Sequence, residues 1–407
     1  MTTVQDRPHS EIPGDPKHVR EALLARAQEL VPLLREHAEA AARDRRLTGE
    51  VADALRAAGM FKLTAPRRVG GHEVNIRTYL EVCAELARGD GSAGWVTMLM
   101  NTGAYLMGQL SDRARDDVYG ADPDAAVCGQ LTPSATARPV DGGFVVTGRW
   151  AWASGSYWAQ WSLPSIPLLD EQGELTDIRA ALIPTTELAI EDTWFAAGMA
   201  ATASNTFVAH EVFVPEHRTL SIFGMSAGVT RSEHTDEPLY RSASHTALTL
   251  ANVGPLLGLA QAAFERVLEI VHRGKPIAYS TYERSIDSPS YQLNIADAAA
   301  LIDTATLHAH RSADAIDTAA HDGVALDELT RARVRSDVAT AATRCREAVS
   351  LLLNVGGASS FAQANPLQRI WRDLEIAARH GLVNVDLGRE IYGRALLGIT
   401  DQVSPMF

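Results

Sequence analysis

The chain carries a helix-like pattern of apolar positions soon after its polar first residues. At intervals of three and four come Val19, Leu23, Ala27, Leu30 and Leu34. This spacing places the five side chains on one face of a helix. Pro32 has no backbone N–H, so we expect it to kink or interrupt that helix near its end.

Capping residues predict further helices up to about residue 120. Thr48 is expected to be an N-cap, and Gly59 should stop the helix that Thr48 begins. A helix is expected over residues 76–87, ended by Gly89, and Ser92 should cap the uncharged run that extends to residue 110. Residues 1–121 are therefore expected to form an N-terminal helical domain.

The period of the pattern changes to that of a strand after Asp122. Asp141, Gly142 and Gly143 give a tight-turn signal between the stretches 138–140 and 144–147. Further strands are expected at residues 161–163, 180–183 and 206–214. Short strands separated by turns predict an antiparallel β-domain over residues 122–220.

Residues 221–407 are helical in pattern again. A heptad seam that should face another helix is formed by Val334, Val338, Ala341, Cys345, Ala348 and Leu352. Asn365 and Pro366 are typical of a helix start, here for residues 367–380. The uncharged run 247–264 approaches the length of a membrane span, but Asn252, Pro255 and Gln261 interrupt it, which favours a helix buried in protein. The expected fold class is mainly α with a central antiparallel β-domain.

Charge and composition exclude some classes of partner. The 407 residues carry 37 Lys and Arg against 50 Asp and Glu, a formal net charge of −13, which repels phosphate backbones and anionic lipid. Three scattered cysteines and a polar N-terminus favour a reducing compartment and a cytoplasmic protein. We expect neither a nucleic-acid partner nor a membrane.

The sequence lacks the common catalytic motifs. It has no GxGxxG after a strand, no P-loop, no GxSxG, no HExxH and no CxxC. His308 and His310 are two residues apart, so on a helix their rings point to different faces and suit a solvated surface better than a metal site. An enzyme with this inventory would need an organic cofactor held outside a Rossmann fold, and we expect no metal.

Two segments carry candidate chemistry, and the first is rich in tryptophan. Four of the seven tryptophans fall between Trp150 and Trp161, around the small polar residue Ser154. Trp150 and Trp152 should share a strand face, which favours a β-domain core. An aromatic wall beside exposed amides and hydroxyls would equally suit a flat heteroaromatic ligand such as a flavin. Composition alone leaves both interpretations open.

The second segment runs from residue 356 to residue 380. Ion pairing on a helix surface is sufficient to explain Arg369, Arg372 and Asp373. His380, just before Gly381, is placed to complement the dipole of a helix end. These structural interpretations need no ligand.

Together, the segments resemble the acyl-CoA dehydrogenase fold and, within it, the group D flavin-dependent monooxygenases, the oxygenase halves of two-component systems. The resemblance follows the chain in order through Gly91-Ser92-Ala93-Gly94-Trp95, Asp141-Gly142-Gly143, Thr147-Gly148-Arg149-Trp150, Ala153-Ser154-Gly155, Asp192-Thr193-Trp194, Gly198-Met199, Val212-Phe213-Val214-Pro215, Pro366-Leu367-Gln368-Arg369, Arg372-Asp373 and His380.

This resemblance implies an N-terminal helical domain, a β-barrel-like domain and a C-terminal four-helix bundle, assembled as a homotetramer. A separate NAD(P)H-dependent flavin reductase would supply reduced FMN or FAD, which would lie between the β-domain and the C-terminal helices. With molecular oxygen the flavin would form a C4a-hydroperoxyflavin, which would transfer one oxygen atom to a small-molecule substrate.

The resemblance also implies roles for single residues. His380 would act as a catalytic residue facing the C4a adduct, and Ser154 would hydrogen-bond the N5 and O4 edge of the flavin. Trp152 and Trp194 would lie along the ring, and Arg273 would meet the flavin phosphate, from a neighbouring subunit. The remaining flavin contacts would be Thr202 and Ser204, and the substrate pocket would hold Trp95, Asn101, Tyr105 and Gln130.

Departures from the family pattern bear on the activity. Acyl-CoA dehydrogenases commonly carry a catalytic Glu-Gly-Thr where this chain has His380 and Gly381, and Glu375 is on a different part of the helix, which argues against that activity. Ala201 and Ala203 stand where glycines are common. Asn101 stands where aromatic hydroxylases often have a histidine, so the substrate stays open.

The main hypothesis is therefore hydroxylation of a small aromatic or polyketide-type compound, in secondary metabolism or aromatic catabolism. N-oxygenation of an amine or amino sugar by the same chemistry is one alternative. An acyl-CoA dehydrogenase or oxidase with bound FAD is a second, and a helical scaffold that has lost its flavin is a third.

Overall fold

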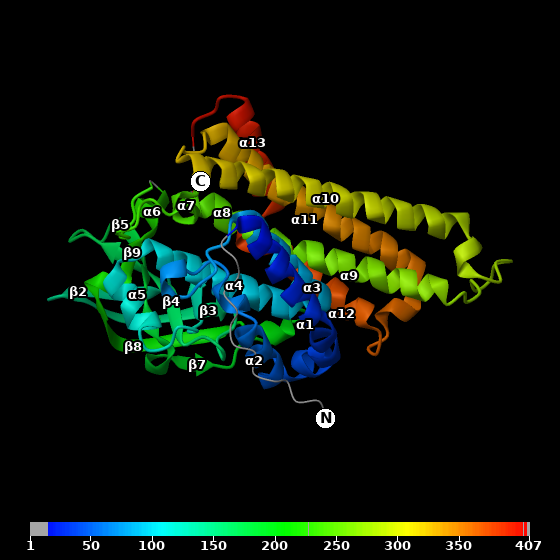
Figure 1. The fold of residues 1–407 in the computed structure, drawn as a ribbon, viewed down its shortest axis with the longest axis horizontal. Helices are drawn as coiled ribbons and strands as arrows, with labels where there is room; N and C mark the ends of the chain where they lie inside the picture. Colours follow the sequence, from blue (N-terminus) through cyan, green and yellow to red (C-terminus); the bar gives the residue numbers. More distant parts are fainter. Residues whose placement is uncertain (1–14, 227, 402, 405–407) are drawn as a thin grey trace.

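The computed structural model describes residues 15–226, 228–401 and 403–404. Helices lie at both ends of this chain and strands lie between them (Figure 1). The N-terminal helices are α1 (Pro16–Asp44), α2 (Gly49–Ala57), α3 (Ile76–Gly89), α4 (Gly91–Gln109) and α5 (Asp112–Tyr119). Helix α3 packs against α1, α4 and α9 (Val253–His272), which joins this layer to the C-terminal helices.

The caps of the first helices agree with the sequence pattern except at two places. The Thr48 side chain accepts from Val51 N–H, and Gly59 has the positive φ of a helix stop, as predicted. Helix α4 is capped by Asp90, which accepts from Ala93 N–H at 2.8 Å, and not by Ser92. Helix α1 continues through Pro32 to Asp44, so the expected interruption is wrong.

Tertiary packing explains why α1 survives its proline. Its buried positions are Val19, Leu23, Ala27, Val31, Leu34, Ala38 and Ala41, and they face α3. Val31 lies in this stripe in place of Leu30, which is only half-buried. Burial of the apolar face on both sides of Pro32 outweighs the one backbone hydrogen bond that the proline removes.

The strands form two sheets. They are β1 (Val127–Gln130), β2 (Ala135–Val140), β3 (Gly143–Ala153), β4 (Trp161–Leu169), β5 (Leu175–Ala181), β6 (Ile183–Pro184), β7 (Ala189–Glu191), β8 (Asn205–Pro215) and β9 (Thr219–Ser221). One sheet has the order β2-β3-β8-β7, and the other has the order β1-β4-β5-β9 with β6 beside β4. Both are mainly antiparallel, although β1 and β4 pair in parallel. In the part of the chain that is described, the sheets are open and do not close into a barrel.

Strand β3 corrects the expectation that Trp150 and Trp152 share a face. Trp150 is buried and its Nε1 donates to the Ser165 carbonyl at 2.9 Å. Trp152 has φ +70° and leaves 67% of its surface exposed. The register with β8 shifts between Trp150 and Ala153, so a bulge turns Trp152 out of the core.

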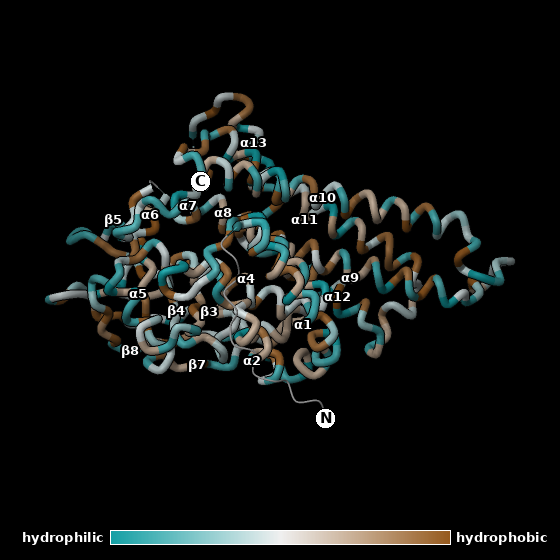
Figure 2. The backbone as a smooth tube through the Cα atoms, in the orientation of Figure 1, coloured by the Kyte–Doolittle hydropathy of each residue, from teal (hydrophilic) through white to brown (hydrophobic). Residues whose placement is uncertain are grey.

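The C-terminal part is a bundle of long helices. Its helices are α6 (Ile222–Ser226), α7 (Pro238–Arg241), α8 (Ser244–Ala251), α9, α10 (Pro289–Asp322), α11 (Glu328–Gly356), α12 (Pro366–Ala377) and α13 (Val385–Leu396). Helices α9, α10 and α11 lie side by side, α12 packs on α9, and apolar residues recur along the long helices (Figures 1 and 2). The predicted heptad seam is buried in α11, where burial raises the pKa of the Cys345 thiol to about 12.

Short 3-10 helices complete the fold. They are η1 (Met60–Lys62), η2 (Arg67–Val69), η3 (Thr185–Glu187), η4 (Ala200–Thr202), η5 (Glu216–Arg218), η6 (Ser285–Asp287), η7 (Ala358–Phe361) and η8 (Gly381–Val383). Two of them, η4 and η8, lie next to candidate site residues.

One segment of the described chain, Ser244–His272, is long and apolar enough to cross a membrane by length and composition alone. Most of its apolar window, 89%, is buried inside the protein. Helix α8 ends at Ala251 and α9 begins at Val253, so Asn252 lies between the two helices, while Pro255 and Gln261 lie within α9. The prediction of a helix buried in protein is confirmed.

Candidate active site

A chain of buried hydroxyl groups lies where β3 ends and β8 begins. Ser154 Oγ is 2.7 Å from Ser204 Oγ, which is 2.7 Å from Thr202 Oγ1. Thr202 Oγ1 donates to the Met199 carbonyl at 2.8 Å. The structure thus joins three of the residues that the sequence analysis assigns to flavin binding.

Two indole rings lie beside this hydroxyl chain. Trp194 Nε1 donates to the same Met199 carbonyl at 2.9 Å. The Trp194 and Trp152 rings are 6.0 Å apart between centroids, with their planes at 54°. Because Trp152 is exposed and Trp194 is only half-buried, these aromatic surfaces are available to a flat ligand.

The C-terminal end of α1 and the start of β8 fasten the segment that carries Trp194. Arg45 Nη1 donates to Asp192 at 2.7 Å and to the Trp194 carbonyl at 3.0 Å. The side-chain oxygen of Asn205 accepts from Trp194 N–H at 3.2 Å. The Trp194 backbone is therefore held by contacts from two separate elements.

His380 lies just beyond α12, where it caps η8. Its ring meets Trp95 of α4 edge to face, with centroids 5.4 Å apart. Burial lowers the pKa of His380 to about 4, so the imidazole is neutral near pH 7. Nδ1 accepts from Leu382 N–H at 3.4 Å, which places the ring proton on Nε2. His380 therefore offers an N–H donor at neutral pH, and it carries no positive charge there with which to complement a helix dipole.

Helix α4 joins the His380 side to the hydroxyl chain. A Cβ placed on Gly155 would lie 2.4 Å from Met100 Cε and 3.3 Å from Val96 Cγ1. Gly155 directly follows Ser154, and Val96 directly follows Trp95, which contacts His380. Helix α4 thus contacts both groups with apolar side chains, His380 through Trp95 and the turn after Ser154 through Val96 and Met100.

The other proposed substrate residues have their polar atoms engaged within the protein. Asn101 lies about 240° around α4 from Trp95, where its amide donates to the carbonyls of Met60 at 2.6 Å and of Thr97 at 2.8 Å. Tyr105 Oη is 2.9 Å from Ser242 Oγ, and Gln130 accepts from Ser162 at 3.0 Å. Trp95 is the member of this set that meets His380, and substrate binding by the other three stays a prediction.

Arg273 begins the loop that follows α9. It follows the last residue of α9 and is exposed. Figure 1 shows the loop after α9 in yellow-green at the right-hand end of the bundle, away from the sheets that carry Ser154 and Ser204. A single chain does not bring Arg273 to the hydroxyl chain.

The sequence analysis missed the roles of Met199 and Asp373. Asp373 is buried and accepts from Met199 N–H at 2.5 Å, and Arg372 Nη1 donates to the Ala197 carbonyl. Surface ion pairing is therefore wrong for these two α12 residues. In the sequence, these residues stood out only as parts of two separate motifs, at residues 198–199 and 372–373. Nothing in the sequence indicated that the two motifs touch.

The structure also gives the partners of Glu375 and of the two histidines of α10. Glu375 is paired with Arg346 at 3.0 Å and with Arg379; although burial raises its pKa, these arginines lower it below the usual value. His308 binds Asp337 at 2.7 Å and His310 is 3.4 Å from Glu81, so neither ring is simply solvated. Among the described residues, no group of three or more potential ligands is placed to hold a metal.

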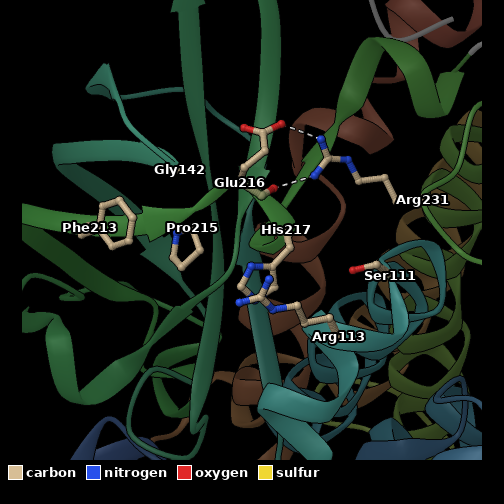
Figure 3. Close-up of a pocket in the computed structure, with 8 residues that line it drawn as sticks. All are labelled: Ser111, Arg113, Gly142, Phe213, Pro215, Glu216, His217 and Arg231. Atoms are coloured by element: carbon tan, nitrogen blue, oxygen red, sulfur yellow. Dashed lines mark hydrogen bonds and ion pairs between the residues drawn. The ribbon is translucent and has the colours of Figure 1, made fainter.

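A cavity of about 690 Å³ lies elsewhere, between α5 and the end of β8. Figure 3 shows Phe213 and Pro215 on one side and Glu216 reaching Arg231 on the other, with His217 between. None of the predicted flavin or substrate residues lines it. Its position separates it from the hydroxyl chain.

The residues around Ser154 fit a flavin. The side chains supply aromatic faces at Trp152 and Trp194 and a buried hydroxyl at Ser154, and the Gly155 backbone approaches α4 closely. A flat ring with hydrogen-bonding edges needs this combination of apolar walls and a few placed polar atoms. The residues around Ser154 therefore have the chemistry that an isoalloxazine ring requires.

Comparison with known proteins agrees with this chemistry. The family described as acyl-CoA dehydrogenase, N-terminal domain, matches residues 17–115, and the family described as acyl-CoA dehydrogenase, C-terminal domain, matches residues 250–385. The chain is 32% identical over 411 residues to the oxygenase component of the FADH(2)-dependent resorcinol hydroxylase of Rhizobium sp. (strain MTP-10005), covering 97% of this chain and 98% of the relative.

Two further likenesses extend over nearly the full length. The flavin-dependent monooxygenase oxygenase subunit HsaA of Rhodococcus jostii (strain RHA1) is 30% identical over 380 residues, covering 92% of this chain and 98% of the relative. The solved structure of XiaF from Streptomyces sp., in complex with FADH2 and glycerol, has a TM-score of 0.90 and 33% identity, covering 97% and 100% of the two chains. The resemblance seen in the sequence is confirmed: the chain belongs to the flavin-dependent monooxygenase oxygenase subunits, built on the acyl-CoA dehydrogenase fold.

Proposed function

We propose that this chain is the oxygenase component of a two-component system that hydroxylates a small aromatic substrate, using reduced flavin and molecular oxygen. The observation that carries the proposal is the position of α4, which contacts His380 through Trp95 and the Ser154–Gly155 turn through Val96 and Met100. In this proposal the neutral imidazole and the hydroxyl chain act on one ligand bound against α4.

Each residue has a defined task in this proposal. Trp152 and Trp194 hold the flavin ring, and Ser154 meets its N5 and O4 edge. A bound reduced flavin supplies the activation of oxygen. The Nε2–H of His380 donates to the oxygen that is transferred, and Trp95 shields that hydrogen bond from water.

The substrate is an aromatic ring that packs against apolar α4 side chains. Val96 and Met100 reach the turn that follows Ser154, and an aromatic substrate gains free energy from this burial. Relatives are named for resorcinol, p-hydroxyphenylacetate and indole-3-acetate, which are all aromatic compounds. We therefore place phenols and indoles first among the candidates.

Two partners complete the system. A separate NAD(P)H-dependent flavin reductase supplies reduced FMN or FAD, as the name "oxygenase component" of the relatives implies for them. A second copy of this chain supplies Arg273 to the flavin phosphate within a homotetramer. The loop after α9, which carries Arg273, lies at the end of the bundle away from the sheets, and this supports the arrangement (Figure 1).

Acyl-CoA dehydrogenation is not supported. That reaction needs a carboxylate base at the substrate, but Glu375 is held by Arg346 and Arg379. His380, at the end of the same segment, is a neutral donor rather than a carboxylate.

The test supplies anaerobic protein with reduced FAD or reduced FMN and a panel of phenols and indoles, and then admits 18O2. We expect one 18O atom in the product and a requirement for reduced flavin. Consumption of oxygen with release of hydrogen peroxide alone, for every substrate and both flavins, would contradict the hydroxylase. Reduction of oxidised FAD by an acyl-CoA would instead support a dehydrogenase.

A further inference from the structure

The hydroxyl chain has a direction, which the Met199 carbonyl fixes. A carbonyl oxygen can only accept, so Thr202 uses its proton to donate to Met199. Ser204 must then donate to Thr202, and Ser154 must donate to Ser204. With its proton engaged, Ser154 presents lone pairs and acts as an acceptor toward a ligand.

The Met199 carbonyl can fix the direction of the hydroxyl chain because α12 holds the Met199 backbone in place. Met199 has a left-handed φ of 51°, which is uncommon for a residue with a side chain. Its N–H donates to Asp373 Oδ1 at 2.5 Å, across 174 positions of sequence. Its carbonyl accepts from the Thr202 hydroxyl at 2.8 Å, from the Trp194 indole at 2.9 Å and from the Thr202 N–H at 3.1 Å.

Gly198 allows this close contact with α12. A Cβ at Gly198 would lie 2.4 Å from the backbone carbonyl of Arg372 and 2.8 Å from the Asp373 nitrogen. Backbone atoms of a helix cannot move aside cheaply, so any side chain here would push the 197–199 segment off α12. Gly198 and Asp373 therefore support the same contact between the 197–199 segment and α12. Gly198 leaves room for the close approach, and Asp373 accepts the hydrogen bond from Met199.

We propose that Asp373, through Met199, is a positioning residue that makes Ser154 an acceptor and so gives the site a preference for reduced over oxidised flavin. This inference rests on the proposed function, in which Ser154 meets the flavin N5 edge. Reduced flavin carries a hydrogen on N5 and can donate to Ser154, whereas N5 of oxidised flavin is itself an acceptor and would face another acceptor. An oxygenase that receives its flavin already reduced gains from this discrimination.

The direct test compares the Kd of dithionite-reduced FAD with the Kd of oxidised FAD, under argon. In Thr202→Val the hydroxyl that gives the chain its direction is gone, so Ser204 and Ser154 can reverse. We expect the preference for reduced FAD to fall about tenfold, the size of one hydrogen bond. Thr343→Val is the matched control, because Thr343 donates to the Ala339 carbonyl at the same 2.8 Å in α11, and it should keep the wild-type ratio.

Asp373 is tested with two variants. Asp373→Ala removes the acceptor for Met199 N–H and should reduce the preference as Thr202→Val does. Asp373→Asn keeps an acceptor oxygen and should restore the wild-type ratio. If Asp373→Ala does not fold, Gly198→Ala, which disrupts the same contact without removing the carboxyl group, takes its place.

A second measurement needs no flavin. The tilted Trp152–Trp194 pair should give a near-UV circular dichroism signal, which Trp194→Phe identifies. We expect Asp373→Ala and Gly198→Ala to lose this signal and Asp373→Asn to keep it.

The outcomes separate the two proposals. If the wild-type protein binds neither form of FAD nor of FMN, the proposed function fails, while the dichroism still reports on the Met199 contact. The inference is overturned if Thr202→Val keeps the full preference for reduced FAD. It is also overturned if Asp373→Asn is as impaired as Asp373→Ala, or if Asp373→Ala keeps both the ratio and the tryptophan signal.

Discussion

Trp95 and His380 meet edge to face, with ring centroids 5.4 Å apart and planes at 68°. The contact joins the first turns of α4 to the chain just after α12. It also covers part of the imidazole with an apolar ring, and burial lowers the pKa of His380 to about 4. At neutral pH His380 therefore works as a hydrogen-bond donor and not as an acid with a proton to release.

We expect His380→Ala to uncouple oxygen consumption from hydroxylation. Loss of one donor in a shielded site should lower product formed per reduced flavin about tenfold and raise hydrogen peroxide correspondingly. His380→Gln keeps an N–H donor and should recover part of the coupling. His308→Ala, in the bundle beside Asp337, should leave coupling unchanged. Product and peroxide are measured in the same reaction, and full coupling in His380→Ala would remove this residue from the mechanism.

We expect Ser154→Ala to weaken the binding of reduced flavin about tenfold, because it removes an acceptor inside a buried site. Ser165→Ala is the matched control. Ser165 is also buried, in β4, and its Oγ has no hydrogen-bond partner among the described residues. Anaerobic fluorescence titration gives both affinities. Equal affinity in the two variants would show that Ser154 does not contact the flavin.

We expect Ala203→Gly to stabilise the protein. Ala203 adopts φ 47°, in the left-handed region, where a Cβ costs about 1 kcal/mol relative to glycine. The free energy of unfolding in urea should rise by about that amount, although the greater freedom of glycine in the unfolded chain reduces the gain. Ala201→Gly is the control, since Ala201 has no positive φ and should be destabilised. A loss of stability in Ala203→Gly would mean that its methyl packing outweighs the backbone strain.

We expect the stability difference between wild type and Asp373→Asn to depend on pH. Burial, and then the charge of Asp90, raise the pKa of Asp373 to about 7, while Arg369 and Arg372 act in the opposite direction. The folded state thus binds this proton more tightly than the unfolded state. The stabilisation of the folded state by the proton on Asp373 is fully present below about pH 4, and it is lost as the pH rises through 7.

The measurement is Tm against pH for both proteins, from pH 4 to pH 8. The wild type should lose stability relative to Asp373→Asn across this range. The pKa of Asp90, in the same cavity of about 200 Å³, is also raised by burial, so Asp90→Asn should shift the Asp373 transition to lower pH. A difference in Tm that does not change with pH would show that Asp373 is ionised throughout.

We expect Arg273→Ala and Ser154→Ala to complement each other if Arg273 serves a neighbour's site. Each variant alone should bind reduced flavin weakly at every site. Oligomers assembled from both variants would contain some sites with both residues intact, and tight binding should reappear at that fraction of sites. The two variants are co-expressed with different tags, and titration of the doubly tagged oligomers with reduced flavin gives the fraction of tight-binding sites. No recovery would place Arg273 outside the neighbour's site.

The sequence by itself determined the order of helices, strands and helices. The heptad seam around Cys345, the caps at Thr48 and Asn365 and the turn at Gly142 are local signals, because each depends on residues within a few positions of one another. The ordered motifs also determined the family. Such local patterns identify a helix, strand or turn without knowledge of the tertiary fold.

Only the tertiary structure decided how the site is built. The bulge after Trp150 turns Trp152 outward, and α1 runs through Pro32, because packing outweighs local preference at both places. Asp373 and Met199 are 174 positions apart, and their hydrogen bond exists because α12 lies directly on the Gly198 segment. Burial then raises the pKa of Asp373 and lowers that of His380. Charge and hydrogen-bond direction in this site come from desolvation and from contacts between distant segments, which no sequence spacing records.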